Sequence, residues 1–131
     1  MYKRQEYKLI NSPAQQSLAR KIIEAGADLI IGHHPHVVQN IEKYQGKLIF
    51  YSLGNIIFDQ YFSPDTQQGL AVGLEIYPDR LACRLFPFQI NLSQPVLISQ
   101  NKASEFLIQI TERSDGKLVD EIKGGIIKIE R

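Results

Sequence analysis

The chain has 131 residues, of which 44% are hydrophobic, and this is enough apolar material for one folded domain with a core. Fifteen basic residues against fourteen acidic ones leave a formal net charge of +1, without a long run of either sign. The balance excludes the basic footprint of a nucleic-acid-binding protein, so no nucleic acid is expected as a partner. No apolar run reaches the length of a membrane span, and no export signal is expected in this chain.

The first expected element is a helix over residues 13–25. Ser12 is a typical N-cap, a proline follows at the first helical position, and Gln15 is placed to complete a capping box. Gly26 can supply the left-handed residue that ends the helix. A short apolar run bounded by glycines follows at residues 27–32, as in a strand buried on both faces. A helix followed by a buried strand predicts an α/β fold.

The rest of the chain reads mainly as β-hairpins. Branched and aromatic residues separated by turn signals predict strands, and one apolar stripe near the C-terminus predicts a helix. The single cysteine, Cys83, falls in one of these strands and is expected to be buried. The expected elements are a hairpin of residues 40–44 and 47–52, a loop at 53–68, a hairpin of 69–77 and 81–90, a helix at 101–113 and a last strand at 126–129.

All three histidines lie together directly after the first strand, in the run Gly32-His33-His34-Pro35-His36. Residues two apart on extended backbone project to the same face, so His34 and His36 can converge on a metal ion while His33 points elsewhere. Pro35 disfavours helical backbone at His34 and is expected to keep the pair extended. Gly32 would let the chain turn sharply at the strand end.

A plainer interpretation of the cluster stays open, in which the histidines are partly exposed polar loop residues. Two imidazoles alone make a weak and unselective metal site, and a hydrolytic two-metal centre normally adds carboxylates. Asp28 and Asp59 are the only acids near the cluster, and neither has a convincing ligand spacing. The histidines are therefore expected to form only part of a site.

The residues around this cluster resemble the CapA family of poly-γ-glutamate capsule biosynthesis proteins. The resemblance is carried by the stretch AGADLIIGHHPHVVQ at residues 25–39, by Ile41-Glu42, Tyr44 and Gly46, and by IFYSLGNIIFD at residues 49–59. It is strong over residues 6–60 and loose over residues 61–131. Members of this family look like calcineurin-type metallophosphoesterases, so residues 1–131 are expected to form a single, incomplete domain of that kind.

The resemblance implies a fold and a metal site. The fold would be the C-terminal portion of a metallophosphatase-like α/β/β/α sandwich, made of a helix, a buried strand, β-hairpins and a C-terminal helix. The site would hold Mn, Zn or Fe, with His34 and His36 as ligands and with Gly32, His33 and Asn55 beside them. For Asn55 the alternative is a turn residue after a glycine. No catalytic residue is assigned.

Several motifs of the family have no counterpart in this sequence. Asp-x-His, Gly-Asp and Gly-Asn-His elements do not occur, and Tyr2-Lys3-Arg4 replaces a His-Trp-Gly triplet. The resemblance therefore implies a C-terminal fragment that is inactive alone and whose partner is the missing N-terminal half of the fold or another copy. The alternatives are a noncatalytic remnant or interaction module with weak metal binding, and a hydrolase completed across a homodimer. A cell-envelope or extracellular setting is implied for the family, without a localisation for this chain.

Overall fold

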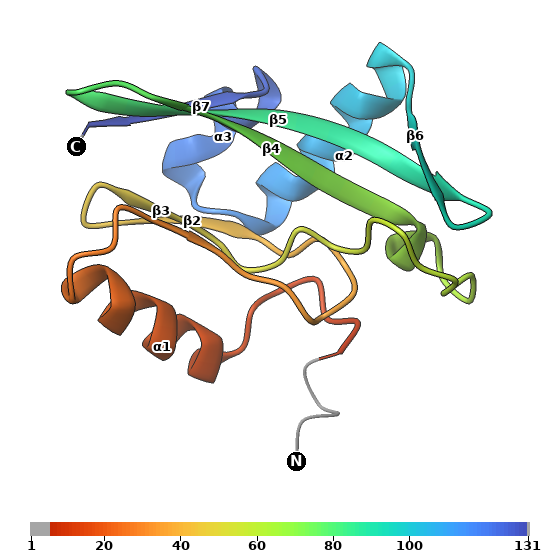
Figure 1. Cartoon of the computed structure of the whole chain (residues 1–131), viewed down its shortest axis with the longest axis horizontal. Helices are drawn as coiled ribbons and strands as arrows, with labels where there is room; N and C mark the ends of the chain where they lie inside the picture. Colours follow the sequence, from red (N-terminus) through yellow and green to blue (C-terminus); the bar gives the residue numbers. More distant parts are fainter. Residues whose placement is uncertain (1–5, 131) are drawn as a thin grey trace.

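The computed structural model describes residues 6–130, and it confirms the α/β class (Figure 1). The Tyr2-Lys3-Arg4 triplet lies outside the described residues. No helix in the described part of the chain is long and apolar enough to span a bilayer. In chain order the elements are α1 (Pro13–Glu24), β1 (Leu29–Ile31), β2 (Ile41–Tyr44), β3 (Lys47–Phe50), a 3₁₀ turn (Pro64–Gln67), β4 (Gln68–Ile76), β5 (Arg80–Asn91), β6 (Gln94–Leu97), α2 (Gln100–Arg113), a 3₁₀ turn (Gly116–Leu118), α3 (Val119–Lys123) and β7 (Ile126–Glu130).

Helix α1 begins with the capping box that the sequence predicts. The Ser12 side chain accepts a hydrogen bond from the Gln15 N–H at 3.2 Å, and the Gln15 side chain accepts one from the Ser12 N–H at 2.8 Å. These two bonds satisfy donors that would otherwise lack partners at the helix start. Ala19 and Ile23 are the buried residues of the helix and pack against the first sheet.

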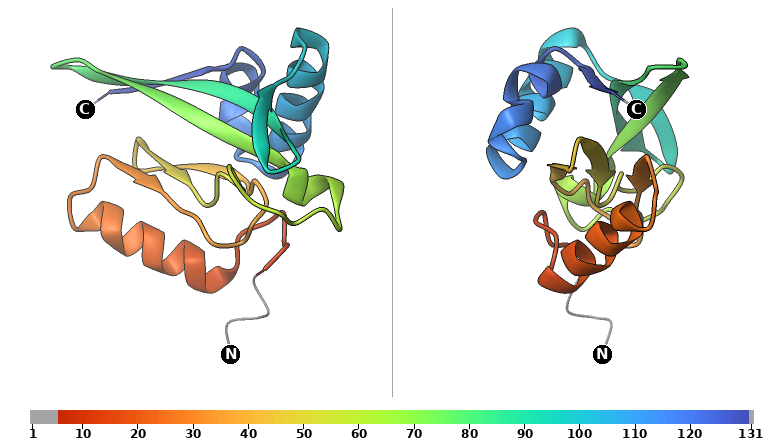
Figure 2. Two further views of the ribbon diagram at one scale, coloured as in Figure 1. Left: turned by 45° about the vertical axis from the view of Figure 1, so that its right-hand side comes forward. Right: turned by 90° about the vertical axis from the view of Figure 1, so that its left-hand side faces the viewer.

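The strands form two sheets that share one core. In the first sheet β3 is central, parallel to β1 and antiparallel to β2. In the second sheet the long strand β5 pairs with β4 on one side and with β6 and β7 on the other. Helix α1 covers the outer face of the first sheet, whereas α2 and α3 lie alongside the two sheets (Figures 1 and 2).

The main core lies where the first sheet, β5, β7 and the two C-terminal helices meet. Cys83 is fully buried there, as expected, and burial raises the pKa of its thiol to about 11. The residues of this core that are least exposed, at 0–1%, are Ile41, Leu48, Phe50, Cys83, Ile110, Leu118, Ile122 and Ile127.

Strand β1 is not buried on both faces, so that part of the sequence interpretation is wrong. The strand lies at the edge of the first sheet, and in residues 6–130 its only strand partner is β3. Ile31 is 44% exposed, and Leu18 and Ile22 of α1 are 61% and 43% exposed. A shallow cavity of about 170 Å³ lies between α1 and this edge. The apolar sequence of β1 is typical of an inner strand, although β1 lies at an open edge of the sheet.

Candidate metal site

The histidine loop begins where β1 leaves the sheet. The Gly32 N–H donates to the Phe50 carbonyl at 2.7 Å, which continues the parallel pairing by one residue. A Cβ atom at Gly32 would lie 2.3 Å from the Tyr51 carbonyl oxygen, so a side chain at this position would clash with backbone. Glycine therefore allows the chain to stay against β3 until the loop turns away.

The backbone of the histidine loop is not extended, and this expectation is wrong. His34 has a φ of 98° and His36 a φ of 64°, a region that residues with a side chain rarely adopt. Pro35 between them is buried, and its carbonyl accepts a hydrogen bond from the Tyr7 N–H at 2.9 Å. The proline is held inside a tight bend, which overrides its preference for an extended neighbour. Such strain costs on the order of 1–3 kcal/mol per residue and is typical of functional sites.

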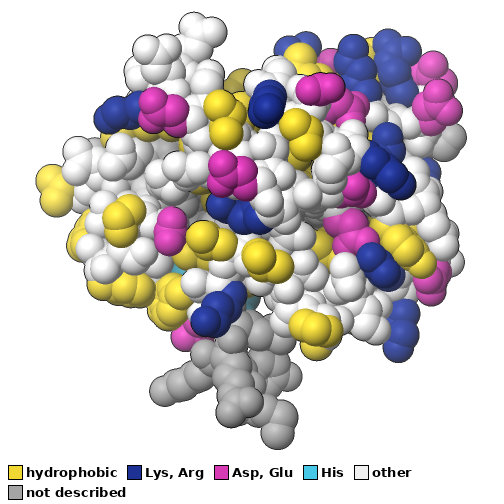
Figure 3. Space-filling view, turned by 180° about the vertical axis from the view of Figure 1, so that it is seen from behind, with side chains coloured by type: hydrophobic (Ala, Val, Ile, Leu, Met, Phe, Trp, Pro, Cys, Tyr) yellow, Lys and Arg dark blue, Asp and Glu magenta, His cyan; other side chains and the backbone are white. Residues whose placement is uncertain are grey.

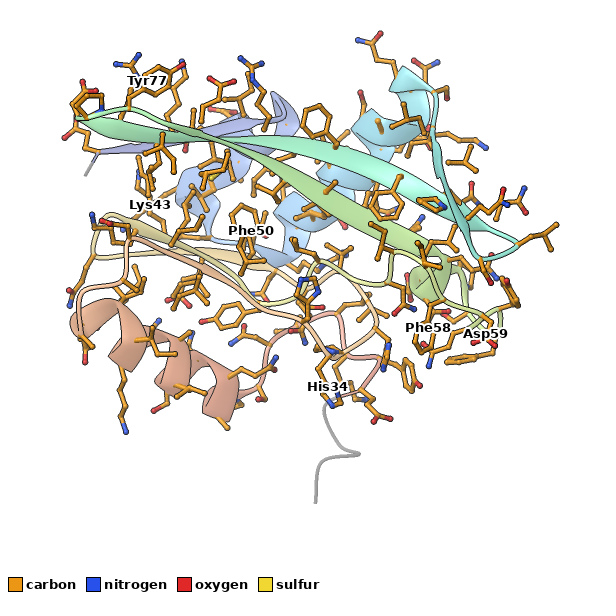
Figure 4. All side chains as sticks on the ribbon, viewed as in Figure 1. His34, Lys43, Phe50, Phe58, Asp59 and Tyr77 are labelled. Atoms are coloured by element: carbon orange, nitrogen blue, oxygen red, sulfur yellow. The ribbon has the colours of Figure 1, made fainter. Side chains whose placement is uncertain are left out.

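The two histidine rings nevertheless lie together. The ring centroids of His34 and His36 are 5.9 Å apart with planes at 52°, close enough for both rings to approach one ion or two neighbouring ions. His34 is exposed on the loop (Figure 4) and His36 is half-buried. His33 is exposed and makes no ring contact with either of them in the described part of the chain. The assignment of His34 and His36 as metal ligands stays a prediction.

Asn55 sets the tautomer of the neutral His36 ring. The Asn55 amide nitrogen donates to the Thr66 carbonyl at 3.0 Å, and a carbonyl can only accept, so the amide oxygen must face His36. That oxygen lies 2.9 Å from His36 Nδ1, which therefore carries the proton. The lone pair of Nε2 is then free to bind a metal ion, and a partner of this kind on the other nitrogen is the usual support for a ligating histidine.

We expect Asn55→Ala to change the tautomer of His36. Without an acceptor at Nδ1, the Nδ1-protonated tautomer loses the hydrogen bond that stabilises it, so the population of the Nε2-protonated tautomer should increase. The substitution also removes the buried amide that donates to the Thr66 carbonyl, at a cost of about 1–3 kcal/mol in the free energy of unfolding. The ¹⁵N chemical shifts of the ring nitrogens report the tautomer. Asn101→Ala, on an exposed helix position, is the matched control.

Aromatic side chains surround His36 on the loop side. Tyr7 stacks on the ring with centroids 5.9 Å apart, and Phe58 approaches it at 5.1 Å. Gln60 links the parts of the site, because it accepts from the Asn55 amide at 3.2 Å and donates to the Tyr7 hydroxyl at 3.0 Å. The sequence interpretation gave these three residues no role, although all of them lie in the stretch that carries the family resemblance.

The neighbouring loop is packed at both ends and open between them. The apolar residues of segment 53–68 predict that part of it packs against the body of the protein, and this is confirmed, because Leu53 packs on the main core and Asn55 and Thr66 are buried. Phe58 packs on His36. Ile56 and Ile57 are 59% and 70% exposed. This edge of the site therefore presents uncovered apolar side chains to its surroundings.

The carboxylates near the cluster do not join it. Asp28 precedes β1, at the opposite end of the strand from the histidines, and accepts a hydrogen bond from Lys47 at 2.8 Å. Asp59 lies on the exposed loop, away from His34 (Figure 4). Residues 6–130 contain no group of three or more His, Cys, Asp or Glu side chains that could hold an ion. The donor set of two imidazoles fits part of a metal centre, and carboxylates would have to come from elsewhere.

The N-terminal part of the chain matches known proteins. Residues 3–60 match the family described as bacterial capsule synthesis protein PGA_cap. The chain is 54% identical over 56 residues to the capsule biosynthesis protein CapA of Bacillus anthracis, and 57% identical over 56 residues to the PGA biosynthesis protein CapA of Bacillus subtilis. A probable polyglutamine synthesis accessory protein of Mycobacterium tuberculosis is 38% identical over 48 residues.

Residues 3–60 are thus similar to the bacterial capsule synthesis proteins, and the resemblance to CapA-type proteins is confirmed over this segment. The matched residues are 43% of this chain and only 14% and 15% of the two Bacillus proteins, and 37% of this chain and 13% of the mycobacterial protein. The matched segment includes α1, the first sheet, the histidine loop and Asn55.

Proposed function

We propose that this chain acts as a C-terminal part of a CapA-type protein of poly-γ-glutamate capsule biosynthesis, with a metallophosphoesterase-like fold. In this proposal His34 and His36 contribute a His-Pro-His element to a centre for Mn, Zn or Fe. The names of the matched relatives support the capsule assignment, because they refer to capsule, PGA and polyglutamine synthesis. The same relatives support a cell-envelope setting for the whole protein.

One observation carries the metal assignment: the rings of His34 and His36 converge, with the Nε2 lone pair of the neutral His36 ring left free by the Asn55 hydrogen bond to Nδ1. A loop that simply exposed polar residues would not need strained backbone at both histidines or a buried amide behind one of them. A bound ion would supply Lewis-acid chemistry at this position. The protein's own residues orient the ligands, and Tyr7 and Phe58 reduce the access of water to the His36 ring.

Calorimetric titration with zinc tests this assignment. The wild-type chain should bind one ion weakly, because two imidazoles are too few ligands for a tight site. The variant with both His34→Ala and His36→Ala should show no specific binding, whereas His33→Ala, on the neighbouring exposed residue, should bind as the wild type does. Equal affinity of wild type and double variant would refute the assignment.

The open edge of β1 supports the proposal that this chain needs a partner. An unpaired edge strand beside exposed apolar side chains is a template for association, and the partner would be the N-terminal half of the fold or a second copy. Alone, the chain should form oligomers at micromolar concentration, as measured by light scattering. Ile31→Lys should disperse them. If Leu97→Lys, on the exposed strand β6, does so instead, β1 is not the contact.

A noncatalytic interaction module with weak metal binding is the second candidate. It is favoured by the donor set, because residues 6–130 bring no carboxylate to the two histidines. The two candidates differ in what a supplied N-terminal half would do. It should complete a metal centre in the first case and leave metal affinity unchanged in the second.

A further inference from the structure

A second cavity lies at the end of the molecule where two hairpin turns and the end of β7 meet. The turn between β2 and β3, the turn between β4 and β5 and the end of β7 all gather at the left of Figure 1, away from the histidine loop. The cavity between them has a volume of about 390 Å³, within the range of ligand pockets in proteins. It is lined by Lys43, Gly46, Arg80, Lys128, Ile129 and Glu130.

The lining of this cleft is strongly basic for this protein. Three basic side chains and one acidic side chain give it a formal charge of +2, whereas the whole chain has a net charge of only +1. The three cations come from three different strands of both sheets. Seen from behind, most Lys and Arg side chains lie on the half of the molecule that contains this end, interspersed with Asp and Glu (Figure 3). The cleft is therefore a local excess of positive charge in a nearly neutral chain.

The two lysines of the cleft are not neutralised by ion pairs of their own. Lys43 and Lys128 make no side-chain hydrogen bond or ion pair within residues 6–130. The hydrogen bonds from Arg84 and Tyr77 are the main causes that lower the pKa of Glu75, and the charge of Lys128 acts in the same direction without a hydrogen bond to that carboxylate. Both lysines can therefore bind an added anion without first breaking a bond.

Arg80 is the one cation of the cleft that is already positioned. Its guanidinium lies over the Tyr77 ring at 4.3 Å, and its ion pair with Asp79 is long, at 3.4 Å, and exposed. Glu130 stands opposite Arg80 in the β5–β7 register, yet the two form no ion pair within 4.0 Å in the described residues. Its acid neighbours therefore hold Arg80 only weakly.

We infer that this cleft binds an extended acidic peptide chain, whose successive carboxylates meet Lys43, Arg80 and Lys128. That the cleft binds an anion is inferred from its charges alone. That the anion is a glutamate chain is inferred from the proposed capsule function. Gly46 has open space around it, so a ligand backbone can approach the β2–β3 turn closely. The cleft suits nucleic acid less, because its lining contains no aromatic side chain on which a base could stack.

Fluorescence anisotropy with a labelled γ-linked glutamate hexamer, in buffer with EDTA, tests the inference. Wild type should bind, with an affinity that falls as salt increases. The double variant Lys43→Gln with Lys128→Gln should bind at least about tenfold more weakly, since each lost contact weakens binding about three- to fivefold. Lys102→Gln, at an exposed position on α2, should bind as the wild type does. Circular dichroism checks that each variant is folded.

Three comparison ligands identify what the cleft recognises. A γ-linked hexamer whose α-carboxylates are replaced by carboxamides has the same backbone without these charges and should not bind. Inorganic triphosphate should compete less well than the glutamate hexamer, and an RNA hexamer should bind more weakly than the peptide. The inference is overturned if the lysine variants bind the glutamate chain unchanged, or if RNA or triphosphate binds better. The variant with His34→Ala and His36→Ala should bind the hexamer normally, so a failed metal assignment and a failed cleft are distinguishable.

Discussion

Phosphatase activity is expected to be absent from the isolated chain, even with manganese, zinc or iron supplied. A two-metal hydrolytic centre uses carboxylates to hold both ions about 3.5–4 Å apart and to balance their charge. Residues 6–130 offer two converging imidazoles, and no acidic side chain joins them. Turnover of a generic phosphate ester should therefore equal that of a matched blank without protein.

Activity should appear when the N-terminal part of a CapA-type relative is fused to the chain or mixed with it. His34→Ala should abolish the restored activity, because it removes a ligand at a site that has no spare one. His33→Ala should retain it, since that side chain is exposed and makes no contact with the other two rings in the described residues. Phosphate release by the isolated chain, lost in His34→Ala, would instead show a complete site formed by self-assembly.

The largest effect on stability is expected for Phe50→Ala, at about 3–5 kcal/mol in the free energy of unfolding. Phe50 is 1% exposed on the central strand of the first sheet and belongs to the core shared with the second sheet. Its truncation leaves a cavity between the layers, in a protein whose total stability is on the order of 5–15 kcal/mol. Urea unfolding followed by circular dichroism measures the change.

Phe62→Ala is the matched control, with the same atoms removed from a side chain that is 65% exposed. It loses an edge contact with Tyr7 and should cost at most about 1 kcal/mol. Similar unfolding midpoints for the two variants would show that the layers do not share a packed core.

Much of the fold could be predicted from local patterns, because its elements have ordinary signals. The capping box at Ser12, the two hairpins and the apolar stripe of α2 all follow from spacing and composition. Strand β6 escaped prediction because its turn uses Leu92 and Ser93 with φ of 49° and 62°, and neither residue type signals such a turn. Helix α3 has only five residues, too few to show a helical period.

Three residues of the candidate site could be named from the sequence, whereas its geometry and the contacts of Tyr7, Phe58 and Gln60 could not. The position of His34 and His36 after a strand, and of Asn55 after a glycine, could be read from the sequence. The left-handed backbone at both histidines could not, because it depends on the burial of Pro35 and on a hydrogen bond from distant Tyr7. The edge position of β1 was hidden for a similar reason, since an apolar strand sequence does not reveal which neighbours are present.

The central claim is that His34 and His36 together hold a metal ion, and NMR with Co²⁺ as a paramagnetic probe tests it most directly. Added in less than one equivalent to the ¹⁵N-labelled chain, Co²⁺ should selectively broaden or shift the ring signals of these two histidines and the amide of Asn55, which touches the His36 ring. The signals of the core should stay sharp. Broadening confined to His33, or spread over exposed carboxylates with His34 and His36 unaffected, would contradict the claim.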